Sequence, residues 1–266
     1  MYLSSTLCWA NAVDEVMELA DRYGFSGVEV WAEHIWYRGT DEAAIVAASE
    51  RYHQELTLHA ASWDLNLCAL NVGVRRQSVH EVERSLELAS RIGAGHVTVH
   101  PGRATLAHVP FSYAHWMNES FCYLAKRAEQ LHVRLSIELM EQIPKELITT
   151  PEAINRLLSM LPSSVTATFD IAHVPMEEDI VRYYRRTSRV SKIHFSDSTV
   201  GCCHVPLGKG QLPIRSIMPF LESADVPIIL EGFDLSPSHD VLHADLDFLQ
   251  SLGTSVRRIP CENTCK

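Results

Sequence analysis

Short apolar runs alternate with longer amphipathic segments along the whole chain. The short runs are rich in β-branched residues and contain roughly four to six residues, a length typical of buried strands. The predicted strands span residues 2–7, 26–31, 56–59, 97–100, 133–138, 165–170, 190–195 and 227–231.

In the segments between these runs, apolar residues recur every three or four positions, which predicts amphipathic helices. Gly24 and Gly93 follow two of the segments as C-caps, and Thr150-Pro151 supplies an N-cap and a proline at the first helical position of another. The predicted helices span residues 13–23, 41–54, 78–92, 113–131, from 151 onward, 177–187, 213–223 and 238–252.

Eight strand–helix units in succession predict a parallel sheet, and this number favours a closed (β/α)8 TIM barrel. No linker rich in Pro, Gly or Ser interrupts residues 1–266, so we expect a single domain. The alternative is an open doubly wound sheet. That fold has a glycine-rich phosphate turn after its first strand, and residues 7–10 are not such a turn.

Composition narrows the class of protein. The chain has 266 residues, 46% of them hydrophobic, and a formal net charge of −10, which argues against a nucleic acid partner. The seven cysteines lack CxxC spacing, and Cys261 and Cys265 lie near the tail, so we expect free thiols in a reducing cytoplasm. We find neither a signal peptide nor an apolar run of the roughly 20 residues that a membrane helix requires.

The strongest chemical signal is that several predicted strands end in a potential metal ligand. Packing alone does not require ionisable residues at these positions, but a site built at the carboxyl end of a barrel does. The strand-end residues are His59, His100, Glu138, Asp170, His194 and Glu231.

Glu138, Asp170, His194 and Glu231 end four consecutive strands and are therefore expected to converge. Three carboxylates that are buried together repel one another unless some are protonated or a cation lies among them. A set of oxygen and imidazole ligands suits Mn²⁺, Zn²⁺, Co²⁺ or Fe²⁺, and Mg²⁺ less readily. The competing interpretation is a group of salt-bridged helix caps.

Several motifs resemble the xylose-isomerase-like TIM-barrel superfamily along nearly the whole chain. They are Gly-Phe-Ser-Gly-Val-Glu29-Val, His100-Pro-Gly and His194-Phe-Ser-Asp197-Ser, together with the carboxylate strand endings. That superfamily includes sugar isomerases and epimerases, inosose and dehydroshikimate dehydratases, and the endonuclease IV family. The resemblance implies the barrel and a divalent metal, but it does not select the reaction.

The segment His59-Ala-Ala-Ser-Trp63-Asp-Leu-Asn66-Leu resembles endonuclease IV. That resemblance implies a second metal bound by His59 and His100 and shared through Glu138. It also implies a third metal at His173 and His204, but Cys202 replaces the expected aspartate.

In the sugar-converting families, by resemblance, one ion binds to the quartet and His173 contacts substrate. Val200 occupies the position where an arginine holds substrate in some sugar epimerases, which argues against close identity with those enzymes. His59 and His100 are then expected to donate hydrogen bonds to substrate. The alternative is that they are core histidines bonded to backbone carbonyls.

Other residues are candidates for binding substrate. His204 and Lys209 lie in a polar loop after the seventh strand, where Lys209 either meets a phosphate or is an exposed loop lysine. Trp63, with Trp9 and Trp31, is expected to form an apolar wall over a sugar ring, with core packing as the alternative. Glu29 is expected to be buried and paired behind the site.

We therefore predict a divalent-metal-dependent isomerase or epimerase that acts on a small sugar or polyol-derived carbonyl compound. Glu138 and Glu231 serve as acid and base through an enediolate as well as metal ligands. The expected partner is a small carbohydrate-like molecule, and a homo-oligomer is left open.

Three alternatives compete with this hypothesis. A dehydratase of the inosose or dehydroshikimate type would use the same site and expel a β-hydroxyl. A phosphodiesterase resembling endonuclease IV would use two or three metals, so the metal stoichiometry separates it from the sugar enzymes. A metal-free binding protein would show no titration with Mn²⁺ or Zn²⁺.

Overall fold

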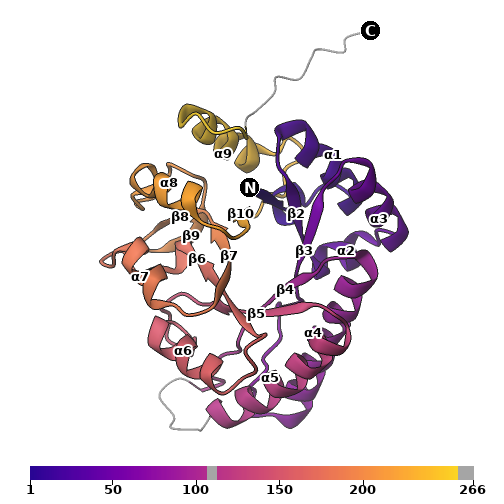
Figure 1. The fold of residues 1–266 in the computed structure, drawn as a ribbon, viewed down its shortest axis with the longest axis vertical. Coiled ribbons are helices and arrows are strands. Elements are labelled where there is room, and N and C mark those ends of the chain that lie inside the picture. Colours follow the sequence, from indigo (N-terminus) through magenta and orange to yellow (C-terminus); the bar gives the residue numbers. More distant parts are fainter. Residues whose placement is uncertain (107–112, 257–266) are drawn as a thin grey trace.

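The centre of the molecule is a closed barrel of parallel strands in the order β1-β10-β7-β6-β5-β4-β3-β2 (Figure 1). The computed structural model describes residues 1–106 and 113–256. The barrel strands are β1 (Tyr2–Ser4), β2 (Gly27–Trp31), β3 (Glu55–His59), β4 (His96–Val99), β5 (Arg134–Leu139), β6 (Thr166–Asp170), β7 (Val190–Phe195) and β10 (Ile228–Leu230). This arrangement confirms the prediction of a (β/α)8 TIM barrel.

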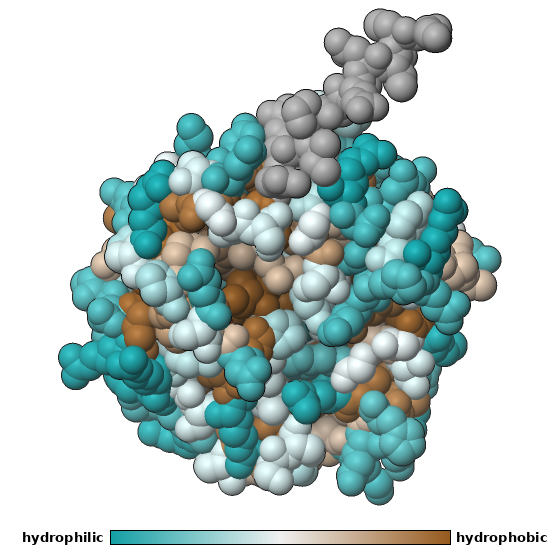
Figure 2. Space-filling model, turned by 45° about the horizontal axis from the view of Figure 1, so that its top comes forward, coloured by the Kyte–Doolittle hydropathy of each residue, from teal (hydrophilic) through white to brown (hydrophobic). Residues whose placement is uncertain are grey.

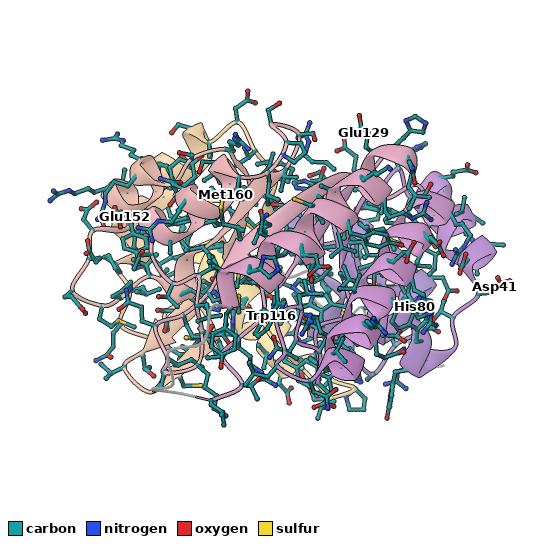
Figure 3. The ribbon with its side chains drawn as sticks, turned by 90° about the horizontal axis from the view of Figure 1, so that it is seen from below. Asp41, His80, Trp116, Glu129, Glu152 and Met160 are labelled. Atoms are coloured by element: carbon teal, nitrogen blue, oxygen red, sulfur yellow. The ribbon has the colours of Figure 1, made fainter. Side chains whose placement is uncertain are left out.

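Helices from the intervening segments surround the barrel (Figure 1). They are α1 (Val13–Tyr23), α2 (Ala32–Arg38), α3 (Glu42–Arg51), α4 (Val72–Ile92), α5 (Tyr113–Gln130), α6 (Pro151–Ser159), α7 (Ile180–Arg186), α8 (Ile214–Ser223) and α9 (Asp240–Ser251). Side chains such as His80 on α4 and Trp116 on α5 belong to this outer layer (Figure 3). One face of the molecule is mainly hydrophilic, and hydrophobic residues appear there as separate patches (Figure 2).

The structure differs from the sequence predictions at several element ends. The first strand stops at Ser4, and Ser5–Cys8 form a 3-10 helix, because Thr6 turns toward β10 and its hydroxyl donates to the carbonyl of Gly232. Helix α4 begins at Val72 instead of residue 78, because the Asn71 side chain caps it by accepting from two backbone N–H groups. Helix α2 was not predicted.

A two-stranded antiparallel hairpin, β8 (Asp197–Thr199) and β9 (Cys202–Val205), follows β7 where the sequence predicts only a polar loop. It is held by hydrogen bonds from the Ser198 and Thr199 hydroxyls to the carbonyl of Cys202. The hairpin carries His204 toward the barrel mouth.

The interior of the barrel beneath the strand ends is polar and hydrogen-bonded. The hydroxyls of Thr98 and Ser136 both bond to that of Thr168, at 3.0 and 2.7 Å. Lys192 donates to Thr98 Oγ1 at 2.9 Å, and Thr57 donates to Glu29 at 3.0 Å. This network replaces an apolar filling with a rigid polar floor under the site.

Two further findings concern the predictions from composition. No helix in residues 1–106 or 113–256 is both long and apolar enough to cross a membrane. The cysteines within those ranges are free thiols, and Cys261 and Cys265 lie outside the described residues.

Candidate metal centre

Glu138, Asp170, His194 and Glu231 meet at the carboxyl end of the barrel. Each offers one ligand atom, and these atoms all lie within 4.8 Å of one another. Glu138, Asp170 and His194 belong to β5, β6 and β7, and Glu231 directly follows β10. Register explains this convergence, because Asp170 pairs with His194 across the β6–β7 ladder and parallel strands end at one rim.

The ligand atoms of this quartet lie within ion-pair distance of one another, but His194 Nδ1, Asp170 Oδ2 and Glu231 Oε2 make no hydrogen bond. His194 Nδ1 lies 2.8 Å from Glu231 Oε2 and 3.4 Å from Glu138 Oε1. Nevertheless His194 Nδ1, Glu231 Oε2 and Asp170 Oδ2 are buried atoms without a hydrogen-bond partner in the described chain. Orphaned oxygen and imidazole atoms at such separations fit a divalent cation.

The second nitrogen of the His194 ring faces a buried charge pair. His194 Nε2 lies 2.7 Å from Glu29 Oε1, and Glu29 Oε2 forms an ion pair with Lys192. All three side chains are essentially inaccessible to solvent. Burial opposes ionisation of Glu29, but the charges of Lys192 and His194 lower its pKa well below the ordinary value. Glu29 therefore faces Nε2 as an ion-pair partner, while Nδ1 of the same ring faces the quartet.

His59, the last residue of β3, and His100, the first residue after β4, converge on the same carboxylate. Their Nε2 atoms lie 3.3 and 3.2 Å from Glu138 Oε2. His59 Nδ1 donates to the carbonyl of Ala60 at 2.9 Å, so its Nε2 is the atom available to a ligand. His59, His100 and Glu138 form a second group whose ligand atoms lie within 4.8 Å of one another.

Asp170, His173 and His204 form a third such group. His173 Nδ1 donates to the carbonyl of Leu139 at 2.9 Å, and its Nε2 lies 3.5 Å from Asp170 Oδ2. His204 bonds to Ser196 Oγ through Nδ1 and has a positive φ of 58°, a strained conformation for a non-glycine residue. Cys202 is exposed and does not belong to any of these groups.

The pKa values of the buried groups in the centre are shifted by burial and by the charges of their neighbours. Burial acts against charge on Glu138, but the positive charges of His194 and His100 lower its pKa well below the ordinary value. Burial raises the pKa of Asp170, with the charges of neighbouring carboxylates adding to the effect. Burial also opposes charge on His173, yet Asp170 and Glu138 raise its pKa to about 9.

The two remaining candidates for substrate binding, Trp63 and Lys209, lie in different surroundings. Trp63 lies at the rim close to Trp9 and Trp31, with ring centroids 5.2 and 6.4 Å away. Lys209 is exposed in the loop after β9. Asp197 holds this loop by accepting from the backbone N–H groups of Gly208, Gly210 and Leu212. Lys209 therefore sits on a fixed loop and is not among the grouped ligands.

Sequence reasoning missed two residues of the site. Lys192 lies two positions before His194, on the same side of β7, so strand alternation could have identified it as an inward-facing cation. Glu141 follows β5, and its buried Oε2 atom lies 3.6 Å from His173 Nε2 without a hydrogen bond. No local motif in the sequence distinguishes Glu141 from its loop neighbours.

Comparison with known proteins supports this architecture. D-Psicose 3-epimerase with D-tagatose from Clostridium cellulolyticum H10 superposes with a TM-score of 0.75, at 16% identity over 95% of this chain and 99% of that one. The TTHB071 protein of Thermus thermophilus, soaked with ZnCl₂, gives a TM-score of 0.71 at 23% identity over 97% and 99%. At these identities, the likeness establishes the fold alone.

Sequence comparison finds further relatives. The uncharacterized protein MJ1311 of Methanocaldococcus jannaschii is 21% identical over 83% of this chain and 78% of its own length. Residues 17–252 match the family model described as xylose isomerase-like TIM barrel. With this match across most of the sequence, the chain belongs to the xylose isomerase-like TIM-barrel family.

Proposed function

We propose that this protein is a divalent-metal-dependent isomerase or epimerase acting on a small sugar or polyol-derived carbonyl compound. The observation that carries the proposal is the buried quartet of Glu138, Asp170, His194 and Glu231, with three ligand atoms that lack hydrogen-bond partners. The sugar epimerase among the structural neighbours supports the same class of substrate.

The quartet divides into two pairs with different roles in this proposal. A bound divalent ion would act as a Lewis acid toward the substrate carbonyl and so acidify the adjacent C–H. Glu138 and Glu231 would remove the α-proton and return it, through an enediolate, while Asp170 and His194 complete the ligand set. Glu231 is 8% exposed whereas Asp170 is fully buried, so Glu231 is the carboxylate with more direct access to substrate.

The histidines around the quartet would position substrate oxygens. His173 has Nδ1 committed to a backbone carbonyl, so only Nε2 remains for a substrate hydroxyl. His100 is partly exposed, with 34% of its side chain accessible, and its Nε2 lies 3.2 Å from Glu138 Oε2, so it would contact a substrate bound beside that carboxylate.

Glutamate replacement tests the mechanism. Glu138→Gln and Glu231→Gln should each reduce turnover by about 10²-fold or more, the range expected for loss of a general acid or base. The measurement is incorporation of solvent deuterium at the α-carbon across a panel of ketoses, inososes and keto acids, with metal content determined on the same samples.

The matched control is Glu152→Gln, an exposed carboxylate on α6 whose ion pair with Arg186 lies on the outer helical layer. This variant should leave both deuterium incorporation and metal content unchanged. Unchanged turnover and metal content in both site variants would exclude the proposed mechanism. Loss of a β-hydroxyl as water after deuterium exchange would identify a dehydratase instead.

A multimetal phosphodiesterase is the second candidate, and a specific observation favours it. Glu138 and Asp170 each belong to two of the three ligand groups, an arrangement suited to adjacent metal ions that clamp a phosphate. The net charge of −10 opposes a DNA substrate. Two or three ions per chain and cleavage of an abasic-site duplex would support the phosphodiesterase; one ion and α-proton exchange would support the isomerase.

A further inference from the structure

A continuous set of aromatic rings leads from the candidate metal centre to solvent. We call this set the aromatic rim, and its members are Trp9, Trp31, Tyr37, Trp63 and Phe233. The Trp9 centroid lies 5.5 Å from that of Tyr37, 5.2 Å from that of Trp63 and 5.2 Å from that of Phe233. Trp31 joins the set through Trp63 at 6.4 Å.

The inner end of the rim touches the candidate metal centre. Trp31 stacks on His59 with centroids 3.9 Å apart and an angle of 7° between the planes. The outer end is open to solvent, because Tyr37 is 69% exposed, Trp63 48% and Phe233 45%. Exposed aromatic rings gathered at one place mark a binding surface.

The rim is built to keep its shape without a ligand. Glu33 Oε1 accepts from the backbone N–H of Trp63 at 3.1 Å, and Arg38 Nε donates to the carbonyl of Trp9 at 2.8 Å. His34 stacks on the inner face of Trp9, with centroids 4.5 Å apart. Rings held in place before binding lose little conformational freedom when a ligand is stacked on them.

One polar atom of the rim lacks a partner. Trp31 is only 8% exposed, and its buried indole Nε1 makes no hydrogen bond in the described structure. A buried N–H donor without an acceptor is costly, and an oxygen of a bound molecule would satisfy it. The rim therefore combines flat apolar faces with one free donor close to the metal centre.

We propose that the aromatic rim is a second subsite, which binds a ring attached to the unit that reacts at the metal centre. The substrate class is then a glycoside: a reacting sugar at the quartet and a second ring with an apolar face against Trp63 and Phe233. The apolar C–H face of a pyranose and the face of an aryl group share this chemistry. The inference rests on the proposed sugar reaction and extends it beyond a free monosaccharide.

Isothermal titration of the metal-loaded protein with three probes tests the subsite. Cellobiose and 4-nitrophenyl β-D-glucopyranoside carry a second ring, and D-fructose does not. Phe233→Ala should weaken binding of a two-ring probe by about tenfold, the scale of one lost aromatic contact, and leave D-fructose binding unchanged. Trp63→Ala should weaken binding of a two-ring probe by a similar factor, and by more than it weakens binding of D-fructose. Tyr123→Ala, with a matched exposure of 45% but located on α5, should change none of the three affinities.

The outcomes distinguish a sugar ring from an aryl group in the subsite, and they test the subsite separately from the proposed reaction. Weakening of both two-ring probes identifies a sugar ring as an occupant, and weakening of the nitrophenyl probe alone identifies an aryl group. Equal weakening of D-fructose binding, absence of any effect, failure of both two-ring probes to bind, or ring-dependent binding of a single-stranded oligonucleotide would overturn the subsite. Deuterium exchange on ketoses tests the reaction separately, so the reaction can stand if the subsite fails.

Discussion

At the scale of single residues, Lys192 is the cation on which the orientation of His194 depends. It is fully buried and paired with Glu29, which in turn faces His194 Nε2. Removing one partner of a buried ion pair leaves the other charge uncompensated, which costs about 3–5 kcal/mol. Lys192→Met should therefore lower the free energy of unfolding by about this amount and also weaken metal binding. Urea denaturation and metal titration measure the two effects.

The double variant Lys192→Met/Glu29→Gln is the control for this prediction. It removes both charges, so it should recover part of the lost stability, but it should not recover metal affinity because Gln cannot hold the ring as a carboxylate does. A double variant as unstable as the sum of the two single variants would show that the charge pair does not couple the residues.

Barrel geometry alone could place only the site residues at strand ends, whereas His173 and His204 were candidates by family resemblance. Asp170 and His194 terminate short β-branched runs, so barrel geometry alone brings them together. Glu141 and His204 could not be placed in this way, because their positions depend on a loop and on a hairpin with a positive φ. The contacts among the aromatic rim residues likewise depend on how separate loops pack, which periodicity does not encode.

At the scale of elements, the loop after β9 is shaped around the Asp197 carboxylate. A Cβ on Gly210 would collide with Asp197 Oδ1 and the carbonyl oxygen of Ser198, whereas a Cβ on Gly201 would meet nothing within 4 Å. Gly210→Ala should therefore lower the free energy of unfolding by about 1–3 kcal/mol, the usual cost of overpacking. Gly201→Ala should remain within about 0.5 kcal/mol of the parent. Equal denaturation midpoints for the two variants would contradict this account.

Helix α9 contributes a buried acid to the same loop. Asp245 accepts from the backbone N–H of Leu207 at 2.6 Å, and burial raises its pKa from 3.8 to about 7. Between these two values the folded state retains a proton that the unfolded state has lost, so the contribution of Asp245 to stability falls as pH rises. Above about pH 7 this loss is complete.

Asp245→Asn keeps an acceptor for Leu207 and removes the titration. Its melting temperature should exceed that of the parent by roughly 5 °C at pH 8, and the gap should narrow steadily toward pH 4. Thermal unfolding monitored by circular dichroism across this range provides the measurement. Gln250→Asn, at an exposed position on the same helix, is the control; it removes no titrating group and should show no such widening. A difference in melting temperature that does not change with pH would refute the raised pKa of Asp245.

At the scale of the whole molecule, alternating strand and helix patterns predicted the barrel because each unit repeats a buried strand followed by an amphipathic helix. Helix α1 matches its predicted range of 13–23, with Gly24 as C-cap at a φ of 80°. Boundaries were less accurate where a tertiary contact ends an element. Strand β1 is cut short by the bond between Thr6 and the carbonyl of Gly232, far along the chain, and local sequence contains no sign of that contact.

The candidate ligands come from strands around most of the barrel, so a bound cation should stabilise the whole fold. They lie at, or one residue from, the carboxyl ends of β3, β4, β5, β6, β7 and β10. At a free metal concentration about 100 times Kd, binding to the folded state alone contributes about 2.7 kcal/mol. For a chain of this size, this should raise the melting temperature by roughly 5–10 °C over the EDTA-treated protein. Mn²⁺ or Zn²⁺ should produce a larger shift than Mg²⁺.

Asp170→Asn distinguishes this effect from simple loss of packing. Without metal, the variant should change stability little, because relief of the repulsion from Glu138 and Glu231 offsets the loss of the charge that Asp170 offers to His173. With Mn²⁺ or Zn²⁺, it should lose most of the thermal shift, because it has lost an anionic ligand. If the parent shows neither a shift nor heat of binding on titration with these ions, the convergence of carboxylates and imidazoles at the barrel mouth serves a metal-free binding protein.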